Sequence, residues 1–333
     1  MKTRINLRKT GFPGLMGQMA ALLLASLAAT FAGDMSVELG LERSGDLETW
    51  ESVELTPEMI TEKGGLTLDG LPNPVFFRLD VSGAAGPVPA PEGMVFVDGP
   101  FPVYMAKNEV TWAEWQTVRA WGVANGYTWS GPDHNESEPS GCAANHPVHS
   151  VSWYDAVKWC NARSEMANLT PAYRVDGEVY RTGDFGTYGS DIVEWNIAAD
   201  GYRLPTEMEW TFAAWGGLDP DYLLYSGSNN LDEVGWYWEN SGNALCNMWE
   251  DTGKGTHPVG QKMPNSLGLY DMSGNVGEWC WDQMHPLHTR IFKGGSWFGP
   301  EEPCRVAFVG EWSPNMRIFN LGFRVVRWVA PPF

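Results

Sequence analysis

The fold is decided by a stretch that reads Asp271-Met272-Ser273-Gly274-Asn275-Val276-Gly277-Glu278-Trp279, followed by Lys293-Gly294-Gly295-Ser296-Trp297 and Gly322-Phe323-Arg324. In it, oxygen-bearing side chains are interleaved with glycines, which let the backbone turn back and expose its carbonyl groups. Tryptophans flank these turns. Because neither the helical nor the strand period recurs, the stretch predicts a rigid irregular platform rather than a helix or a repeat.

The composition predicts a compact, turn-rich protein of acidic character. The chain has 333 residues, of which 43% are hydrophobic, and its 38 Gly and 23 Pro argue against a helical bundle. A formal net charge of -19 repels nucleic acid and anionic membranes, so we expect no nucleic-acid partner. High acidity also supplies oxygen ligands for hard cations such as calcium.

The N-terminus has the layout of a secretory signal. Basic residues precede a weakly polar run over 15–32 that ends in small residues, which predicts a signal peptide over 1–32 cleaved near Ala32. A membrane anchor is the alternative, but the Ala-rich part over 19–32 is short for a span of about 20 apolar residues. We therefore expect a secreted, periplasmic or cell-envelope protein with no membrane association after cleavage. Its five cysteines, an odd number, leave at least one free, reactive or paired with another chain.

The rest of the chain divides into three predicted parts. Residues 33–82 read as short strands and predict a small β-rich accessory module. Residues 83–91 are a linker by composition, because Pro and Gly punctuate them and no apolar period recurs. The main domain is expected over 92–330.

Three helices are predicted in the main domain, because three segments share the same N-terminal capping pattern. A hydroxyl residue followed three positions later by a carboxylate satisfies the open amide groups of a first helical turn. Cys160 falls on the apolar face of the second helix, so it is interpreted as a core thiol rather than a nucleophile. The three pairs are Thr111 with Glu114, Ser152 with Asp155, and Thr206 with Glu209.

Several segments together resemble the sulfatase-modifying factor family, whose founding member is the formylglycine-generating enzyme. The resemblance extends over roughly residues 92–328 and implies an α+β fold related to C-type lectins, with little regular secondary structure and stabilised by calcium. The segments that carry it are His146-Pro147-Val148, Val151 to Ala156, Gly201 to Trp210, Pro258-Val259-Gly260, Pro264-Asn265, Gly268 to Met272, Gly274-Asn275-Val276, Gly294 to Trp297 and Gly322-Phe323-Arg324.

The resemblance also implies two calcium sites. Both agree with the preference of calcium for six to eight oxygens from mixed carboxylate and carbonyl donors. The second has all its donors within one eight-residue loop, although a plain structural loop without an ion stays open for either site. The first set is the Asn240 side chain, the Ser241 carbonyl, Asp251 and the Gly253 carbonyl; the second is Asp271, the Gly274 and Val276 carbonyls, and Glu278.

The copper chemistry of the active family members does not carry over in full. They bind copper(I) through two cysteine thiolates placed three and eight residues after the serine that corresponds to Ser296, and a linear copper(I) pair needs both thiolates. Here the first position is Gly299 and the second is Cys304. Counting backward from Gly322 instead places the second position near Glu301.

Two further positions depart from the family pattern. Gly277 replaces a tryptophan that lines the oxygen pocket of the active enzymes, and Val309 replaces an arginine. Copper is therefore not expected. Cys304 and Ser296 remain the candidate catalytic residues if any activity is retained.

The favoured hypothesis is an exported, non-catalytic binding or assembly protein, because the required ligand pair is missing. Its ligand would be an unknown protein or a carbohydrate, with a sulfatase among the candidates. The competing hypothesis is an oxidoreductase that converts a sulfatase cysteine to formylglycine or performs a related protein oxidation at Cys304. A third, ranked last, treats 298–320 as a diversified recognition surface.

Overall fold

The computed structural model describes residues 3–8, 38–44, 51–53, 76–82, 90–99, 102–129, 143–185, 189–244, 252–284 and 288–329. The chain divides into two compact units, one formed by Met1–Pro89 with Ala330–Phe333 and the other by Ala90–Val329. Residues 83–89, most of the predicted linker, lie outside the described residues. Among the described residues, no helix has the length and apolar character needed to cross a bilayer.

The first unit contains a four-stranded antiparallel sheet with the strand order β1-β4-β2-β3. β1 lies within the segment predicted to be a signal peptide and pairs with β4 from Thr3 opposite Val81 to Arg8 opposite Phe76. Cleavage of that segment stays a prediction. The strands are β1 (Thr3–Arg8), β2 (Glu38–Ser44), β3 (Glu51–Val53) and β4 (Phe76–Ser82).

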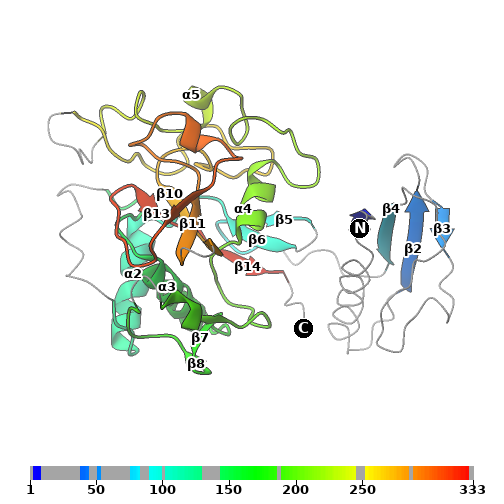
Figure 1. The fold of residues 1–333 in the computed structure, drawn as a ribbon, viewed down its shortest axis with the longest axis horizontal. Coiled ribbons are helices and arrows are strands. Elements are labelled where there is room, and N and C mark those ends of the chain that lie inside the picture. The colour runs from blue at the N-terminus through cyan, green and yellow to red at the C-terminus, as the bar shows by residue number, and fades with distance from the viewer. Residues whose placement is uncertain are drawn as a thin grey trace. The chain divides into compact units, whose positions relative to one another are not determined.

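The first two strands and the last strand of the second unit form one sheet, which has the order β14-β6-β5. β14 pairs antiparallel with β6, with Val326 opposite Met105. The beginning and the end of the unit are thereby joined (Figure 1). The strands are β5 (Met94–Val97), β6 (Val103–Ala106) and β14 (Val326–Trp328).

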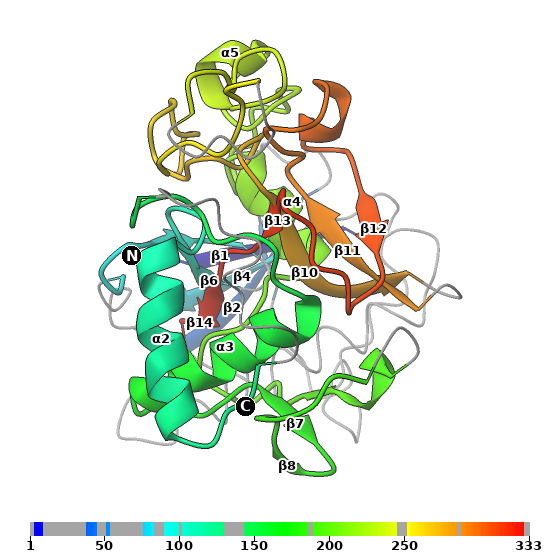
Figure 2. The same ribbon diagram turned by 90° about the vertical axis from the view of Figure 1, so that its left-hand side faces the viewer.

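All three predicted helix starts are confirmed, each with the complete reciprocal capping box. α2 and α3 lie side by side in both views (Figures 1 and 2). α3 is buried along most of its length, and Cys160 is fully buried within it, as expected of a core thiol. The helices are α2 (Trp112–Ala124), α3 (Trp153–Met166), α4 (Glu207–Ala214) and the short α5 (Leu231–Val234).

A second four-stranded sheet, of order β12-β11-β10-β13, carries the fold-deciding stretch. β10 begins at Gly277 and pairs parallel with β13, so Glu278 lies opposite Gly322. Loops around α5 occupy one end of the unit, and the β7–β8 hairpin lies at the opposite end (Figure 1). The remaining elements are β7 (Tyr173–Val175), β8 (Glu178–Val179), η3 (Ser190–Ile192), β9 (Glu194–Trp195), β10 (Gly277–Met284), β11 (Thr289–Lys293), η4 (Glu302–Cys304), β12 (Gly310–Trp312) and β13 (Leu321–Gly322).

The unit is thus α+β with little regular secondary structure, as the sequence predicts. Its core is held together by aromatic packing rather than by long elements. Trp115 stacks parallel to Trp159 with ring centroids 6.4 Å apart, and both rings meet the edge of Phe323. Within the described part of the chain, six tryptophans are essentially solvent-free, namely Trp115, Trp153, Trp159, Trp210, Trp279 and Trp297.

Candidate functional site

The loop from Asp271 to Glu278 turns back on itself before entering β10. Asp271, Gly274 and Asn275 all have positive φ, of 55°, 92° and 56°. A Cβ at Gly274 would lie 2.3 Å from the carbonyl oxygen of Trp236, so only glycine fits there. The predicted irregular platform is therefore present, and its glycine permits the close approach of a neighbouring loop.

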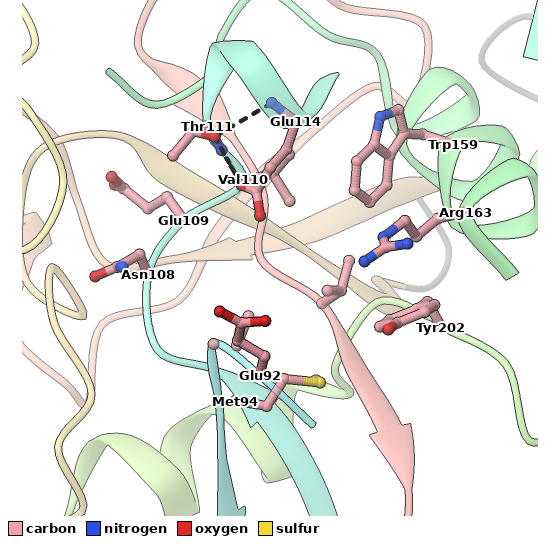
Figure 3. A pocket seen from close by; sticks show the side chains of 13 residues that line it. Glu92, Met94, Asn108, Glu109, Val110, Thr111, Glu114, Trp159, Arg163 and Tyr202 are labelled. Carbon is pink, nitrogen blue, oxygen red and sulfur yellow. Dashed lines mark hydrogen bonds between the residues drawn. The ribbon is translucent and has the colours of Figure 1, made fainter. Parts of the chain in front are cut away.

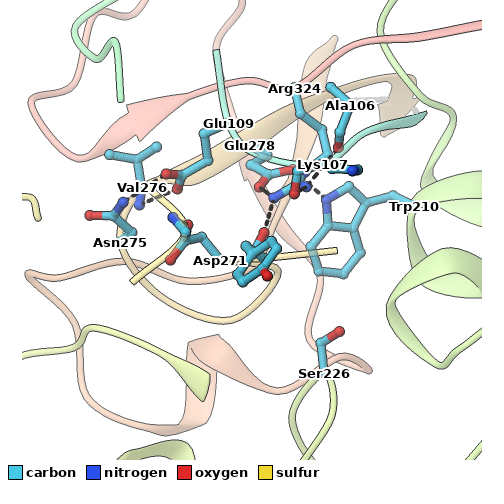
Figure 4. A network of polar contacts seen from close by, with 12 residues as sticks. Ala106, Lys107, Glu109, Trp210, Ser226, Asp271, Asn275, Val276, Glu278 and Arg324 are labelled. Carbon is cyan, nitrogen blue, oxygen red and sulfur yellow. Dashed lines mark hydrogen bonds and ion pairs between the residues drawn. The ribbon is translucent and has the colours of Figure 1, made fainter. Parts of the chain in front are cut away.

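Glu278 is held by an arginine and a tryptophan in the interior (Figure 4). Nε and Nη2 of Arg324 each donate to a different oxygen of Glu278 at 2.6 Å, a bidentate geometry. Nε1 of Trp210 donates to Oε2 of the same carboxylate at 2.6 Å. Since Arg324 and Glu278 are both fully buried, this ion pair has no competition from water.

A third carboxylate, Glu109, belongs to the same network but was not predicted. Its oxygens accept hydrogen bonds from the Val276 backbone N–H at 2.9 Å and from Nδ2 of Asn275 at 2.7 Å. Arg324 extends the network by donating to the Ala106 and Lys107 carbonyls at 3.1 and 3.2 Å. The loop is therefore fastened to the segment after β6, more than 160 positions earlier in the chain.

The network carries more negative than positive charge. The carboxylates of Glu109, Asp271 and Glu278 are each at most 1% exposed. Arg324 supplies a guanidinium to this group and forms its ion pair with Glu278. Burial, followed by the charges of Asp271 and Glu278, raises the pKa of Glu109 well above its usual range. Burial likewise raises the pKa of Asp271 to about 6. Protons or a bound cation can relieve this excess charge.

Asp271 is the part of the second predicted calcium set that fits a cation best. Its Oδ2 accepts the Gly260 backbone N–H at 2.7 Å, whereas its buried Oδ1 has no hydrogen-bond partner among the described residues. Both oxygens of Glu278 already accept hydrogen bonds. Among the described residues, no three His, Cys, Asp or Glu side chains are grouped as a metal site. An ion here would therefore depend on Asp271 and on main-chain carbonyls such as those of Gly274 and Val276.

The first predicted calcium set lies in two neighbouring loops. Ala244 N–H donates to the Gly253 carbonyl at 2.9 Å, and Gly255 N–H donates to the Ser241 carbonyl at 3.3 Å. Oδ1 of Asn240 accepts the Tyr237 N–H at 2.8 Å. Asp251, the predicted carboxylate ligand, lies outside the described residues. This set stays a prediction.

Ser296, Gly299 and Cys304 lie close together beside η4, where the family resemblance places copper. Gly299 N–H donates to the Ser296 carbonyl at 3.2 Å, and the Ser296 hydroxyl accepts from Nδ2 of Asn320 at 2.7 Å. A Cβ at Gly299 would find no atom nearer than 3.9 Å, which is ordinary van der Waals contact, so a side chain could begin at this position without a clash.

Cys304 is enclosed in an apolar cluster. It is fully buried, and its Sγ lies 3.8 Å from the Pro300 carbonyl oxygen. Burial raises the pKa of its thiol to about 12, which opposes the thiolate that a nucleophile or a copper ligand requires. The cluster consists of Cys304 with Tyr225, Leu231, Val234 and Tyr237.

The space next to Gly277, where the family has a tryptophan, is filled. A Cβ at Gly277 would lie 3.1 Å from Cδ1 of Leu321 and 3.1 Å from Cδ2 of Phe292. Val309, the position where the family has an arginine, is 39% exposed. Glu301, the position reached by counting backward, is exposed and accepts a hydrogen bond from the Tyr225 hydroxyl at 3.3 Å. A side chain at position 277 would therefore require Leu321 and Phe292 to shift.

Comparison with known proteins identifies the family that has this fold. The family model described as the sulfatase-modifying factor enzyme 1-like domain matches residues 46–329. The chaperone protein LppX of Paenibacillus barcinonensis is 40% identical over 240 residues, which cover 67% of this chain and 79% of LppX. The formylglycine-generating enzyme of Mus musculus is 29% identical over 225 residues, 61% of this chain and half of that enzyme. The crystal structure of CarF superposes with a TM-score of 0.56 at 31% identity and covers 68% of this chain and 86% of CarF.

Proposed function

The chain belongs to the sulfatase-modifying factor family, and from this premise we propose that it is an exported, non-catalytic binding or assembly protein stabilised by calcium. The proposal rests on one observation, the state of the two positions that would hold copper. Gly299 has no side chain, and Cys304 has a buried thiol with a raised pKa. A single protonated thiol in an apolar cluster is a poor copper(I) site.

The similarity to a protein named as a chaperone supports the binding part of the proposal. LppX shares 40% identity over most of its own length, a higher figure than that of the mouse formylglycine-generating enzyme. We therefore favour a protein partner. A sulfatase and a carbohydrate are the other partners to test. The signal-like N-terminus supports an encounter outside the cytoplasm or in the cell envelope.

Calcium would act in this protein as a structural ion. In the second set, Asp271 with the Gly274 and Val276 carbonyls would hold it beside Glu278, and the first set of Asn240, Ser241, Asp251 and Gly253 would hold another ion. The ion would supply positive charge to a buried network that has three carboxylates. The unpartnered Oδ1 of Asp271 is the observation that supports this placement.

An oxidoreductase is the second candidate, favoured by the retained Ser296 and by Cys304 eight residues after it. Ser296 is only 5% exposed and lies next to Gly299, where a Cβ would be 4.0 Å from its hydroxyl oxygen. For this activity the Cys304 thiolate would have to form despite its burial. Both the pKa of Cys304 and the glycine at position 299 weigh against it.

The decisive assay incubates the purified protein with copper(I), oxygen and a cysteine peptide of the sulfatase type and follows the peptide by mass spectrometry. We expect no copper-dependent conversion of the cysteine by the wild type or by Cys304→Ser. An active formylglycine-generating enzyme serves as the positive control. Conversion by the wild type that is lost in Cys304→Ser would replace the proposal with the oxidoreductase.

A further inference from the structure

A pocket of about 280 Å³ lies between β5, the segment that follows β6, and α3. It includes none of Ser296, Gly299 and Cys304, and it adjoins the carboxylate network only through Glu109. Its size is near the lower end of the roughly 300–1,000 Å³ typical of ligand pockets. The pocket therefore suits a small molecule (Figure 3).

One wall of the pocket is cationic. The Arg163 side chain projects from α3 toward the space, and its guanidinium carbon lies 4.9 Å from the centroid of the Tyr202 ring. Arg163 makes no hydrogen bond or ion pair through its side chain to any other described residue. The guanidinium of Arg327, which does not line the pocket, lies 5.8 Å from the centroid of the same ring.

An arginine without a carboxylate partner is informative in this chain. Asp and Glu number 41 against 22 Lys and Arg, so carboxylates are abundant enough to pair with each cation. Some buried arginines use this supply, such as Arg203, which pairs with Glu209 at 2.7 Å. Arg163 thus keeps its donors available for an anionic group that enters the pocket.

The opposite wall is anionic. Glu92 and Glu114 line the same pocket, and Figure 3 shows both side chains around the space that Arg163 also faces. Oε2 of Glu114 accepts from the backbone N–H and the hydroxyl of Thr111, whereas Glu92 has no partner among the described residues. Neither carboxylate forms an ion pair with Arg163. The cavity therefore separates groups of opposite charge.

We propose that this pocket binds a small zwitterion of free amino acid or dipeptide size. Its carboxylate would pair with Arg163 over the face of Tyr202, and its ammonium group would lie against Glu92 and Glu114. A purely anionic ligand would face the two glutamates, and a purely cationic ligand would face Arg163, so each would meet a like charge. Met94, Val110 and Val325 supply apolar surface for the part between the two charged ends.

Isothermal titration calorimetry on the purified full chain tests the proposal with glycine, L-leucine and glycylglycine as zwitterions. Acetate and methylammonium serve as the separate halves. We expect at least one zwitterion to bind with a Kd below about 1 mM, and each half to bind at least about tenfold more weakly, because it satisfies only one wall. No binding of any zwitterion, or acetate binding as tightly as the zwitterions, would overturn the proposal.

Variants locate the binding on the two walls. Arg163→Gln and Glu92→Gln should each weaken the zwitterion by at least about tenfold, and Arg163→Lys should retain part of the affinity because it keeps the charge. Glu178→Gln, on the exposed β8 hairpin, is the matched control and should bind as the wild type does. Glu114 is left unchanged because it caps α2. If Arg163→Gln is folded and binds the zwitterion as tightly as the wild type does, and Glu92→Gln and Arg163→Lys also bind it with unaltered affinity, the assignment is contradicted.

Discussion

Replacing Asp271 by Asn should change stability in opposite directions with and without calcium. Burial raises the pKa of Asp271 from 3.8 to about 6, so its ionised form is disfavoured in the folded protein. The protonated form therefore stabilises the fold below about pH 4, and this contribution is lost as the pH rises from 3.8 to about 6. The shift corresponds to about 3 kcal/mol of destabilisation at neutral pH when no cation is bound.

Asparagine has the same shape and no charge. In a calcium chelator near pH 7.5, Asp271→Asn should be more stable than the wild type, by up to about 3 kcal/mol. Below about pH 4 the difference should disappear, since both side chains are then neutral. The Asn oxygen can still accept the Gly260 N–H, which Oδ2 of Asp271 accepts at 2.7 Å.

Calcium should reverse this order. At about 1,000 times its dissociation constant, a ligand that binds only the folded state adds about 4.1 kcal/mol of stability, which exceeds the charge effect of about 3 kcal/mol, and the variant lacks the carboxylate needed for it. Urea unfolding followed by tryptophan fluorescence measures both conditions. Asp219→Asn, at an exposed position, is the control and should match the wild type throughout. An Asp271→Asn protein that is several kcal/mol less stable than the wild type in chelator, and equally responsive to calcium, would refute the charge argument.

Three other outcomes follow from buried groups. Arg324→Met should lower the free energy of unfolding by about 3–5 kcal/mol, because it leaves the Glu278 carboxylate buried without its cation; chemical denaturation at neutral pH checks this, and a change below about 1 kcal/mol would contradict it. Gly277→Trp should destabilise by at least about 1–3 kcal/mol, since Leu321 occupies the space beside it; an unchanged thermal midpoint would show that the space is open. Cys304 in the native protein should resist iodoacetamide near pH 8 and react after denaturation, which peptide mass mapping detects; rapid native labelling would contradict its burial.

The parts of this fold that local chemistry determines could be predicted from the sequence. Ser152 and Asp155 are three residues apart, and their reciprocal hydrogen bonds form within one helical turn. The turn at Gly274 is likewise a local property of its glycine. Such features need no knowledge of distant segments.

The parts that depend on distant segments could not be predicted. Glu109 reaches the Val276 backbone from 167 positions away, and nothing in the residues around Glu109 marks it as a member of the network. Arg324 was recognised as part of a motif, but its pairing with Glu278 required the structure. The environment of Cys304 was also hidden, because the cluster that buries it comes from the separate segment 225–237.

Metal content after loading with copper(I) shows whether this family scaffold is retained without its copper site. The purified mature protein is reduced, incubated with copper(I), desalted and measured by mass spectrometry of the elements, with Cys304→Ser alongside. We expect both proteins to contain bound calcium, and to contain copper at far below one ion per chain. Stoichiometric copper in the wild type that is absent from Cys304→Ser would contradict this expectation.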